Sequence, residues 1–278
     1  MKVSIIIAFY KDLQALGLIF DALRRQTYKN FEVVVAEDNN APETKHFLAT
    51  QQGLEISHIH HPDIGRTKAA AQNQAVCAAN GEYLIFIDGD CIPFSTFIEG
   101  HIAFCAPKRV MSGRRVNLPD FLSGQLRQGT LSSERLEKKY LRYAFQHLIW
   151  NKDVHYEQGF FVNPNGLLYK LIFSRRNRNT QILGCNFSCF KKDFIAINGF
   201  DESYGLSILG DDTDLNWRFV DYGAQLRSCK NIANMFHLHH SRPSYKYDPS
   251  EDLRRFNERK AAHLFVCEQG INQYCGDQ

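Results

Sequence analysis

The sequence carries little net charge and has no long apolar run. Its 33 Lys and Arg against 30 Asp and Glu leave a formal charge of +3 at pH 7, well short of the basic excess typical of a dedicated nucleic-acid-binding protein. No apolar stretch approaches the roughly 20 residues that cross a bilayer. Met1-Lys2 leads directly into an apolar run without a small-residue cleavage site. We therefore expect a cytoplasmic protein that does not bind nucleic acid.

The cysteines lack the spacing of a metal or redox motif. There are eight, and no two of them form a C-x-x-C pair, so no structural zinc site is predicted. Without a secretory signal, we expect them to be reduced and structural. They lie at positions 77, 91, 105, 185, 189, 229, 267 and 275.

The first part of the chain alternates short apolar runs with helical patterns, and its 44% apolar residues suffice for a packed core. This alternation predicts a parallel, doubly wound α/β sheet. The expected strands are Val3–Ala8, Phe31–Ala36, Ile56–His60 and Glu82–Ile87. The expected helices follow Asp12 and then span Pro42–Ala49, Thr67–Ala79 and Phe94–Phe104.

The alternation loosens after residue 118. We expect one domain, with residues 1–118 as its first half, 119–245 as its second half and 246–278 as a C-terminal helix and tail. In the second half we predict an amphipathic helix over Ser132–Trp150, a helix over Thr213–Tyr222 and a strand-like stretch over Gln225–His240. A last helix opens at Ser250, and Asn163–Asn179 is expected to be a basic loop.

Asp88-Gly89-Asp90 directly follows the buried-looking strand that ends at Ile87. The carboxyl ends of parallel strands form the ligand-binding crevice of open α/β sheets. Two carboxylates separated by a glycine can approach one Mg²⁺ or Mn²⁺, which favour oxygen ligands and bridge to phosphates. A solvated Asp-Gly turn is the alternative for this motif taken by itself.

Several segments in order resemble the inverting family 2 glycosyltransferases, which have the nucleotide-sugar-binding GT-A fold. They are Val3 to Tyr10, Gln26 to Val35 with Glu37-Asp38, Ala70-Ala71-Gln72-Asn73, Ala79 to Tyr83, and Asp88-Gly89-Asp90. The chain departs from the family pattern in having Ala8 where Pro is usual and Glu37-Asp38-Asn39-Asn40 where Asp-Asp-Gly-Ser is usual.

The resemblance implies a GT-A mixed sheet flanked by helices and a set of donor-binding residues. Asp38 would accept a hydrogen bond from uracil, and Ala8 and Tyr10 would flank the base. Lys68 would reach the donor phosphates, beside Asp88 and Gly89. Simple packing is an equally good interpretation of Tyr10. For Lys68, a solvated position on a helix is an equally good interpretation.

Residues 184–218 are similar to the C-terminal region of family 7-type galactosyl and N-acetylgalactosaminyl transferases. This likeness rests on Gly184 to Lys192, Gly199 to Glu202 and Gly210-Asp211-Asp212 onward. It implies that Asp212 is the catalytic base and that Asp211 and Asn186 bind the acceptor. An acidic helix-capping cluster is the alternative.

The resemblance further places metal ligation at His240, with His237 as a second ligand beside Asp88 and Asp90. In an extended strand, His237 and His240 would point to opposite faces. Both could reach one metal only if the strand ends or turns between them.

Together these features predict a metal-dependent inverting glycosyltransferase with Mn²⁺ or Mg²⁺ as cofactor. It would use a nucleotide-sugar donor, most simply a UDP-sugar, and a glycan or lipid-linked glycan acceptor in surface polysaccharide biosynthesis. The rivals are a sugar nucleotidyltransferase, which should have a glycine-rich loop where Ala8 to Asp12 has no glycine, and a non-catalytic binding module.

Peripheral contact with an anionic membrane is a further possibility, at the inner face of the cell membrane. The basic segment 175–178 and the last helix, with Leu253, Phe256, Leu264 and Phe265, could make it. Packing of this helix on the domain is the stronger expectation.

Overall fold

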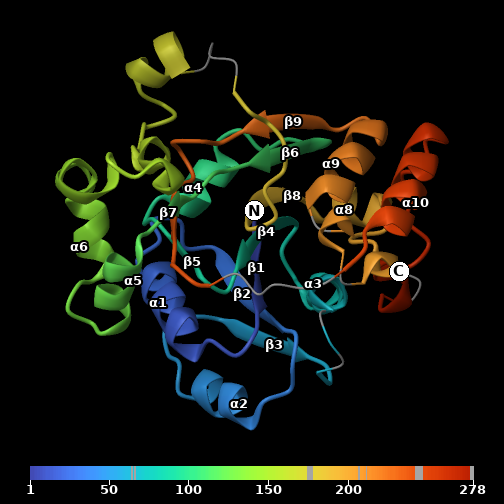
Figure 1. The fold of residues 1–278 in the computed structure, drawn as a ribbon, viewed down its shortest axis with the longest axis horizontal. Coiled ribbons are helices and arrows are strands. Elements are labelled where there is room, and N and C mark those ends of the chain that lie inside the picture. Colours follow the sequence, from blue (N-terminus) through green and yellow to red (C-terminus); the bar gives the residue numbers. More distant parts are fainter. Residues whose placement is uncertain are drawn as a thin grey trace.

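A seven-stranded mixed sheet of order β3-β2-β1-β4-β8-β6-β9 forms the centre of the molecule, with a three-stranded sheet β5-β10-β7 beside it (Figure 1). The computed structural model describes residues 1–63, 65, 67–173, 178–205, 207–210, 212–241 and 247–275. The strands are β1 (Val3–Phe9), β2 (Phe31–Glu37), β3 (Ile56–His60), β4 (Tyr83–Asp88), β5 (Cys91–Pro93), β6 (Arg109–Ser112), β7 (Val116–Asn117), β8 (Asn186–Phe190), β9 (Gln225–Ser228) and β10 (Met235–His237).

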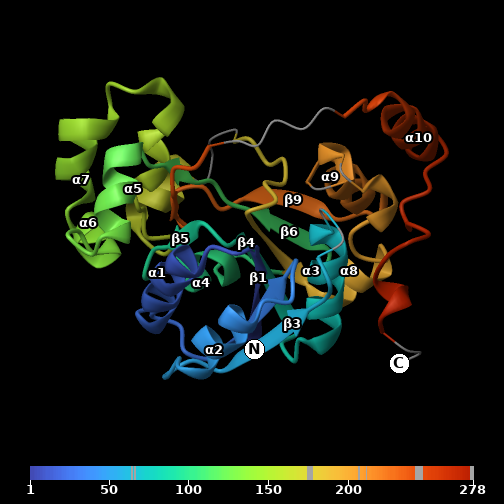
Figure 2. The same ribbon diagram turned by 60° about the horizontal axis from the view of Figure 1, so that its bottom comes forward.

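The α-helices lie on both faces of the large sheet and at the two ends of the molecule (Figures 1 and 2). They are α1 (Leu13–Arg24), α2 (Pro42–Ala49), α3 (Lys68–Ala78), α4 (Phe97–Ile102), α5 (Asp120–Arg127), α6 (Ser133–Lys138), α7 (Tyr140–Tyr143), α8 (Lys191–Ala196), α9 (Asp212–Asp221) and α10 (Ser250–Ala261). Two π-helical turns, η1 (Ala144–Leu148) and η4 (Tyr169–Phe173), lie between α7 and β8.

The first four strands of the large sheet are parallel, as predicted. β1 pairs with β2 on one side and β4 on the other, and β3 extends the sheet beyond β2. The strand order therefore reverses between β1 and β4, which creates a switch point where ligands bind in such sheets. In this register Ala8 lies opposite Asp88.

The other three strands make the sheet mixed, as the GT-A resemblance implies. β8 runs antiparallel to both β4 and β6, and β9 is parallel to β6. In the small sheet, β10 pairs antiparallel with β5, and His237 lies opposite Cys91. This pairing brings residue 237 to the turn that follows β4.

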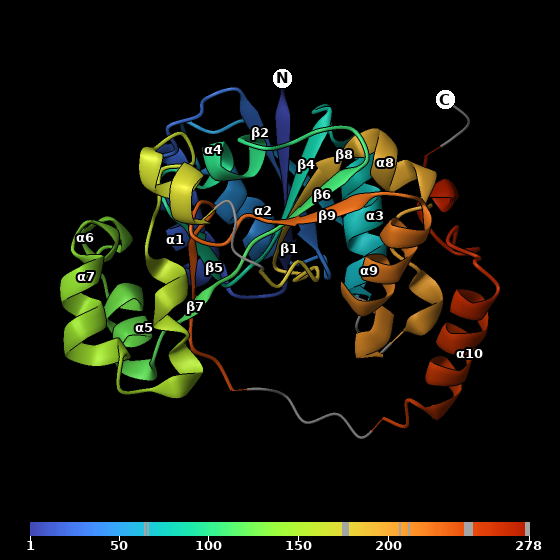
Figure 3. The same ribbon diagram turned by 90° about the horizontal axis from the view of Figure 1, so that it is seen from above.

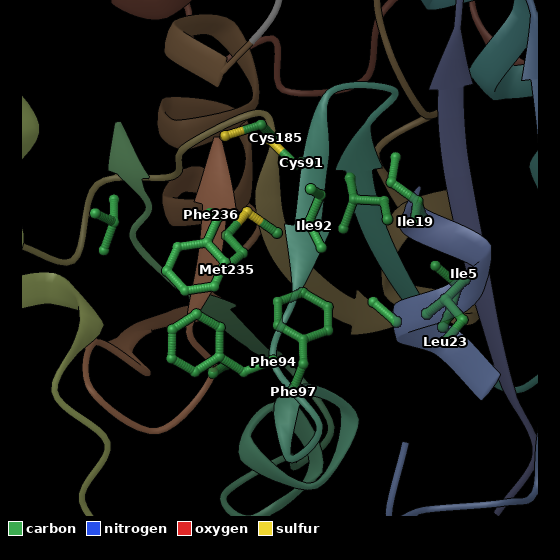
Figure 4. Close-up of a cluster of buried hydrophobic side chains, with 14 of the residues drawn as sticks. Ile5, Ile19, Leu23, Cys91, Ile92, Phe94, Phe97, Cys185, Met235 and Phe236 are labelled. Carbon is green, nitrogen blue, oxygen red and sulfur yellow. The ribbon is translucent and has the colours of Figure 1, made fainter. Parts of the chain in front are cut away.

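The core lies between the sheets and the helices that cover them. Asp12 caps α1 by accepting a hydrogen bond from the Ala15 amide at 3.0 Å. Ile19 and Leu23 of α1 pack toward β1, while Phe94 and Phe236 join the small sheet to the same core (Figure 4). Burial of such side chains is the main favourable term that holds the switch point in place.

Two predicted elements are interrupted in the structure. The predicted helix Ser132–Trp150 is broken at Lys139, whose φ of −108° and ψ of 22° are not helical. The buried residues Leu136, Tyr140 and Ala144 keep the helical spacing, so the pattern was present but the hydrogen bonding is not continuous. The predicted strand Gln225–His240 is split into β9 and β10, with Asn231 at a positive φ of 69° between them.

The prediction that all cysteines are reduced is wrong for one pair. Cys77 of α3 is joined to Cys275 in a disulfide, with Cα atoms 5.5 Å apart. The chain end reaches α3 because Ile271 is buried in the core cluster that also contains Val76. The other six cysteines are free thiols, and all of them except Cys105 are buried.

α10 packs on the domain, as the stronger expectation had it. Phe256 is buried, and its ring lies 6.1 Å from that of Trp217 on α9. Among the residues that the structure describes, we find no helix with the length and apolar character to traverse a bilayer.

Candidate active site

A cavity of about 840 Å³ opens at the carboxyl ends of the parallel strands, at the switch point. Acidic and basic side chains face one another across it, which suits a ligand that carries phosphates and a cation. The cavity is lined by Ala8, Phe9, Tyr10, Asp12, Ala36, Asp38, Asp63, Gly65, Lys68, Asp88, Gly89, Asp90, Arg115, Arg127, His237 and His240.

Asp88 ends β4, and its neighbour Gly89 lies tight against β1. A Cβ at Gly89 would lie 2.9 Å from the Ala8 carbonyl oxygen, so only glycine fits there without a shift. The Lys68 ammonium at the start of α3 donates to Asp88 Oδ1 at 2.6 Å. The structure thus brings Lys68 to the acidic turn, where a bound phosphate would compete for it.

Asp90 lies against the two histidines that the sequence singled out. Its Oδ2 is 3.3 Å from His237 Nε2 and 3.2 Å from His240 Nε2. β10 ends at His237, so the chain turns before His240 and both rings reach the same carboxylate. The condition set by strand alternation is therefore met.

The contact with the two histidines changes the pKa of Asp90. Burial by itself would raise the pKa of Asp90, but hydrogen bonds with His237 and His240 outweigh it and hold that pKa well below its ordinary value. The hydrogen bond with Asp90 raises the pKa of His240. Asp90 is therefore an ionised carboxylate at neutral pH.

These side chains suit a divalent cation. The ligand atoms of Asp90, Cys91 and His237 lie within 4.8 Å of one another, while Asp88 ends the strand just before them. Two carboxylates with imidazoles match the donor preferences of Mn²⁺, and the carboxylates alone match those of Mg²⁺. Asp88, Asp90, His237 and His240 are the residues that would hold the ion.

The predicted base-binding residues line the same cavity. Ala8 and Tyr10 line it, and the Tyr10 hydroxyl donates to Asp63 Oδ2 at 3.1 Å. The carboxylate of Asp38 accepts from the Thr67 amide at 3.0 Å and from the Thr67 hydroxyl at 2.5 Å. Asp38 therefore also positions the turn that opens α3, a role that the sequence did not reveal.

The predicted acceptor residues lie apart from these side chains. Asp212 opens α9, is half-buried, and accepts from the Gly184 amide at 3.2 Å. It is not among the lining residues of the cavity. Cys185, which follows Gly184 in the chain, accepts a hydrogen bond at 3.1 Å from the guanidinium of Arg115, and Arg115 does line the cavity. Asp212 is therefore linked to Arg115 of the cavity wall through Gly184 and Cys185, but it does not itself line the cavity.

The structure does not bring Asn186 to the cavity. Its side chain is fully buried, donates to the Arg114 and Ala233 carbonyls, and contacts His101 Nε2 at 2.9 Å. Asp211 lies outside the described residues. Asp214, two residues after Asp212, is buried in an ion pair with Arg218 at 2.5 Å.

Sequence reasoning missed two cations at the site. Arg115 and Arg127 both line the cavity, and Arg127 pairs with Asp12 at 2.7 Å. Both follow the β4 region in the chain, on segments with no motif of their own. They reach the site because β7 joins the small sheet beside β10, a pairing that no local pattern records.

A second cavity of about 550 Å³ adjoins the first, because His237 and His240 line both. Its wall is largely polar and comes from the segment after β7. The other lining residues are Asn117, Leu118, Pro119, Asn151, Asp153, Val154, His155 and His239.

A mixed sheet of this order, with an acidic turn at the end of β4, places the chain in the GT-A class of nucleotide-sugar-binding folds. Residues 4–171 match Glycosyl transferase family 2, and residues 172–241 match a family described as the N-terminal domain of galactosyltransferase. The first match covers more than half of the sequence, and the chain belongs to glycosyl transferase family 2.

The chain is similar to known glycosyltransferases. It is 30% identical over 108 residues to the E. coli UDP-Glc:alpha-D-GlcNAc-diphosphoundecaprenol beta-1,3-glucosyltransferase WfaP, covering 39% of this chain and 43% of that protein. S. aureus TarS in complex with UDP-GlcNAc superimposes with a TM-score of 0.62 at 14% identity, over 99% of this chain and 69% of that one.

A second solved structure has the same fold. The mannosyltransferase PcManGT from Pyrobaculum calidifontis, in complex with GDP-Man and Mn²⁺, has a TM-score of 0.55 at 14% identity, over 98% of this chain and 67% of that one. The chain spans less than half the length of WfaP. A further relative is the Amylovoran biosynthesis glycosyltransferase AmsB of Erwinia amylovora, which is 30% identical over 94 residues, covering 31% of this chain and 30% of that protein.

Proposed function

We propose that this chain transfers a sugar, with inversion, from a UDP-sugar to a hydroxyl group of a glycan or lipid-linked glycan acceptor in surface polysaccharide biosynthesis. The observation that carries the proposal is the contact of Asp90 with His237 and His240 beside Asp88-Gly89, in a cavity at the switch point. A solvated turn at the end of a strand would not need contacts between two histidines and one of its carboxylates.

The donor would lie along the cavity from Asp38 to Asp90. Ala8 and Tyr10 flank the base, Asp38 accepts a hydrogen bond from it, and Lys68 turns from Asp88 to a phosphate. Asp88, Asp90, His237 and His240 would hold Mn²⁺ or Mg²⁺, which would supply positive charge for the diphosphate leaving group. Arg115 and Arg127 add positive charge to the same wall.

The acceptor would approach from the side of α9. Asp212 would take the proton from the attacking hydroxyl, which displaces the nucleotide from the opposite face of the sugar. Support comes from the position of Asp212 at a helix start, where the amide groups favour an ionised carboxylate. In this proposal residues 1–118 serve the donor, residues 119–245 the acceptor, and Asp211 contacts the acceptor.

We further propose that a lipid-linked acceptor brings the protein to the cytoplasmic face of a membrane. WfaP is named for a diphosphoundecaprenol-linked substrate. Peripheral contact with an anionic membrane would then be part of the function.

A panel of nucleotide sugars with Mn²⁺, read as released nucleotide, tests the proposal. Asp90→Ala should lower turnover at least about a hundredfold, because a metal supplies several kcal/mol of charge stabilisation and each ~1.4 kcal/mol is tenfold. Asp21→Ala, an exposed acid on α1 that pairs with Arg24, is the matched control and should retain full turnover.

Three outcomes would change this proposal. Full turnover in excess chelator would remove the metal from the mechanism. Formation of a nucleotide sugar and pyrophosphate from UTP and a sugar phosphate would indicate a nucleotidyltransferase. UDP binding without transfer to any acceptor would indicate a binding module.

A further inference from the structure

Large apolar side chains are exposed in one segment of the chain. Of the large apolar residues that the described structure exposes, eight fall between positions 141 and 172. The three most exposed are Trp150 at 81%, Phe145 at 74% and Leu141 at 73%. We refer to these eight as the apolar surface: Leu141, Phe145, Trp150, Phe161, Leu167, Leu168, Leu171 and Ile172.

The apolar surface lies at one end of the molecule. Helices α5, α6 and α7 stand together at the left in Figures 2 and 3, at the opposite end from α10. The short yellow helix before β8 lies toward the same side in Figure 1. Contiguous exposed apolar side chains mark an interaction site, whereas single ones are common on any surface.

The segment from Lys138 to Phe173 and the five residues that follow it are together basic. From position 138 to 178 the sequence has eight Lys and Arg against two Asp and Glu, whereas the whole chain carries only +3. The rest of the chain is therefore net negative. Lys139, Arg142 and Lys170 are exposed next to the apolar residues, and Tyr143 and His147 add amphipathic rings. Aromatic and basic side chains together are typical of a surface that sits on anionic lipid.

The apolar surface continues into the site. Trp150 is followed by Asn151, which lines the second cavity, and that cavity shares His237 and His240 with the first. A surface that held Trp150 in the lipid headgroups would bring this polar cavity to the membrane. The diphosphate and sugar of a lipid-linked glycan lie at that depth.

We propose that the segment from Lys138 to Phe173 docks on an anionic membrane, with the apolar surface inserted among the headgroups. This assigns the membrane contact of the proposed function to a different place from the last helix. On α10, Phe256 is buried, while Arg254 and Arg255 pair with acids of the same helix. That helix therefore presents fewer exposed apolar residues than the segment, and two of its arginines are held in ion pairs.

Vesicle flotation without donor tests the docking. The parent should bind vesicles of phosphatidylcholine mixed with phosphatidylglycerol and bind phosphatidylcholine vesicles weakly. Phe145→Ser combined with Trp150→Ser should weaken binding at least about tenfold, since about 1.4 kcal/mol of insertion free energy corresponds to that factor. Leu253→Ser combined with Leu264→Ser, two exposed apolar residues near α10, is the matched control and should bind like the parent.

A charge variant and fluorescence give independent readings. Lys139→Gln combined with Arg142→Gln should reduce the preference for anionic vesicles while leaving the apolar residues intact. The chain has two tryptophans, and Trp217 is buried, so quenching by brominated lipid should affect Trp150 alone. No quenching at saturating vesicles would overturn the proposal.

Other occupants of the surface give different results. Equal vesicle binding by the parent and the Phe145/Trp150 variant, with loss in the α10 variant, would assign the contact to α10. Self-association of the parent in gel filtration, abolished by the same double substitution, would show that a second copy covers the surface. Turnover on an acceptor free of lipid, measured without vesicles, should be unchanged in the variant, so failure of docking and failure of the transferase function are distinguishable.

Discussion

Asp38 both holds the turn before α3 and lines the cavity, so a single substitution affects both places. Its carboxylate is held by the amide and hydroxyl of Thr67, yet it lines the cavity at the end of β2, where it can meet a base edge. A change at Asp38 therefore alters both the turn before α3 and any contact with the nucleotide.

We predict that Asp38→Ala lowers the affinity for UDP by roughly tenfold or more. Loss of a hydrogen bond to a charged group costs about 1.5–3 kcal/mol, which corresponds to that change in affinity. Calorimetric titration with UDP measures it. Thr67→Val removes only the hydroxyl and should leave the affinity nearly unchanged. Equal losses in both variants would show that Asp38 acts through the turn and not on the base.

At the scale of single elements, α9 carries acids in different environments. Asp212 at its start is half-buried, whereas Asp214 is fully buried against Arg218, Trp217 and Tyr204. Asp214 therefore bonds to residues of the core and is not part of a capping cluster with Asp212.

Asn substitutions should resolve these acids by different measurements. Asp212→Asn should lose at least about a hundredfold in kcat, the scale of a positioned base, with unchanged stability. Asp214→Asn should cost about 3–5 kcal/mol in the free energy of unfolding, because it leaves Arg218 buried without its charge partner. Turnover and urea denaturation measure the two effects. If Asp211→Asn abolishes turnover while Asp212→Asn does not, Asp211 is the base.

A buried histidine joins α4 to the sheet. His101 is fully buried, contacts Asn186 Oδ1 at 2.9 Å and Ser188 Oγ at 2.8 Å, and burial lowers its pKa to about 3. The unfolded chain, with an ordinary histidine, takes up a proton below about pH 6.5 that the folded protein does not. Acidification from that value toward pH 3 must therefore destabilise the fold.

We predict that this histidine contributes about 2 kcal/mol to the loss of stability between pH 7 and pH 5, at ~1.4 kcal/mol per pH unit below its unfolded pKa. His101→Gln keeps an amide donor toward Asn186 but cannot titrate, so its stability should change less over this range. Urea denaturation of both proteins at the two pH values checks this. An identical pH dependence in both would exclude His101 as the cause.

Short-range pattern explains which elements the sequence predicts. The helices and strands up to β4 lie within a few residues of their expected places, because each has a continuous apolar period and a cap or turn residue at its ends. Leu136, Tyr140 and Ala144 keep the helical period through Lys139, so the break there could not be seen. Asp38, Asp88, Asp90, His237 and His240 were found through motifs, whereas Asp63, Arg115 and Arg127 reach the cavity through tertiary structure that no motif records.

At the scale of the whole molecule, one disulfide joins two distant parts of the chain. Cys77 and Cys275 are separated by 198 positions, so their disulfide joins α3 to the C-terminal tail. A loop of this length restricts the unfolded chain strongly, and the loop-entropy estimate is about 4–5 kcal/mol.

We predict six free thiols per chain in protein purified without reductant and then denatured. Cys275→Ser should lower the free energy of unfolding by up to about 4–5 kcal/mol, and reductant should have the same effect on the parent but none on the variant. A thiol count with Ellman's reagent and urea denaturation give the two readings. Eight thiols would show that the link is not formed.

The two histidines that contact Asp90 lie far from it in the sequence, and this has a consequence for the protein during its synthesis. The four parallel strands are complete once residue 88 has been made, and domains fold as they emerge. His237 and His240, however, come from β10 and the turn after it, which are made long after residue 88. A nascent or prematurely ended chain can therefore carry the acidic turn and the parallel strands yet lack half of the side chains on which turnover would depend. Unfinished copies would remain inert toward the cell's supply of activated sugar.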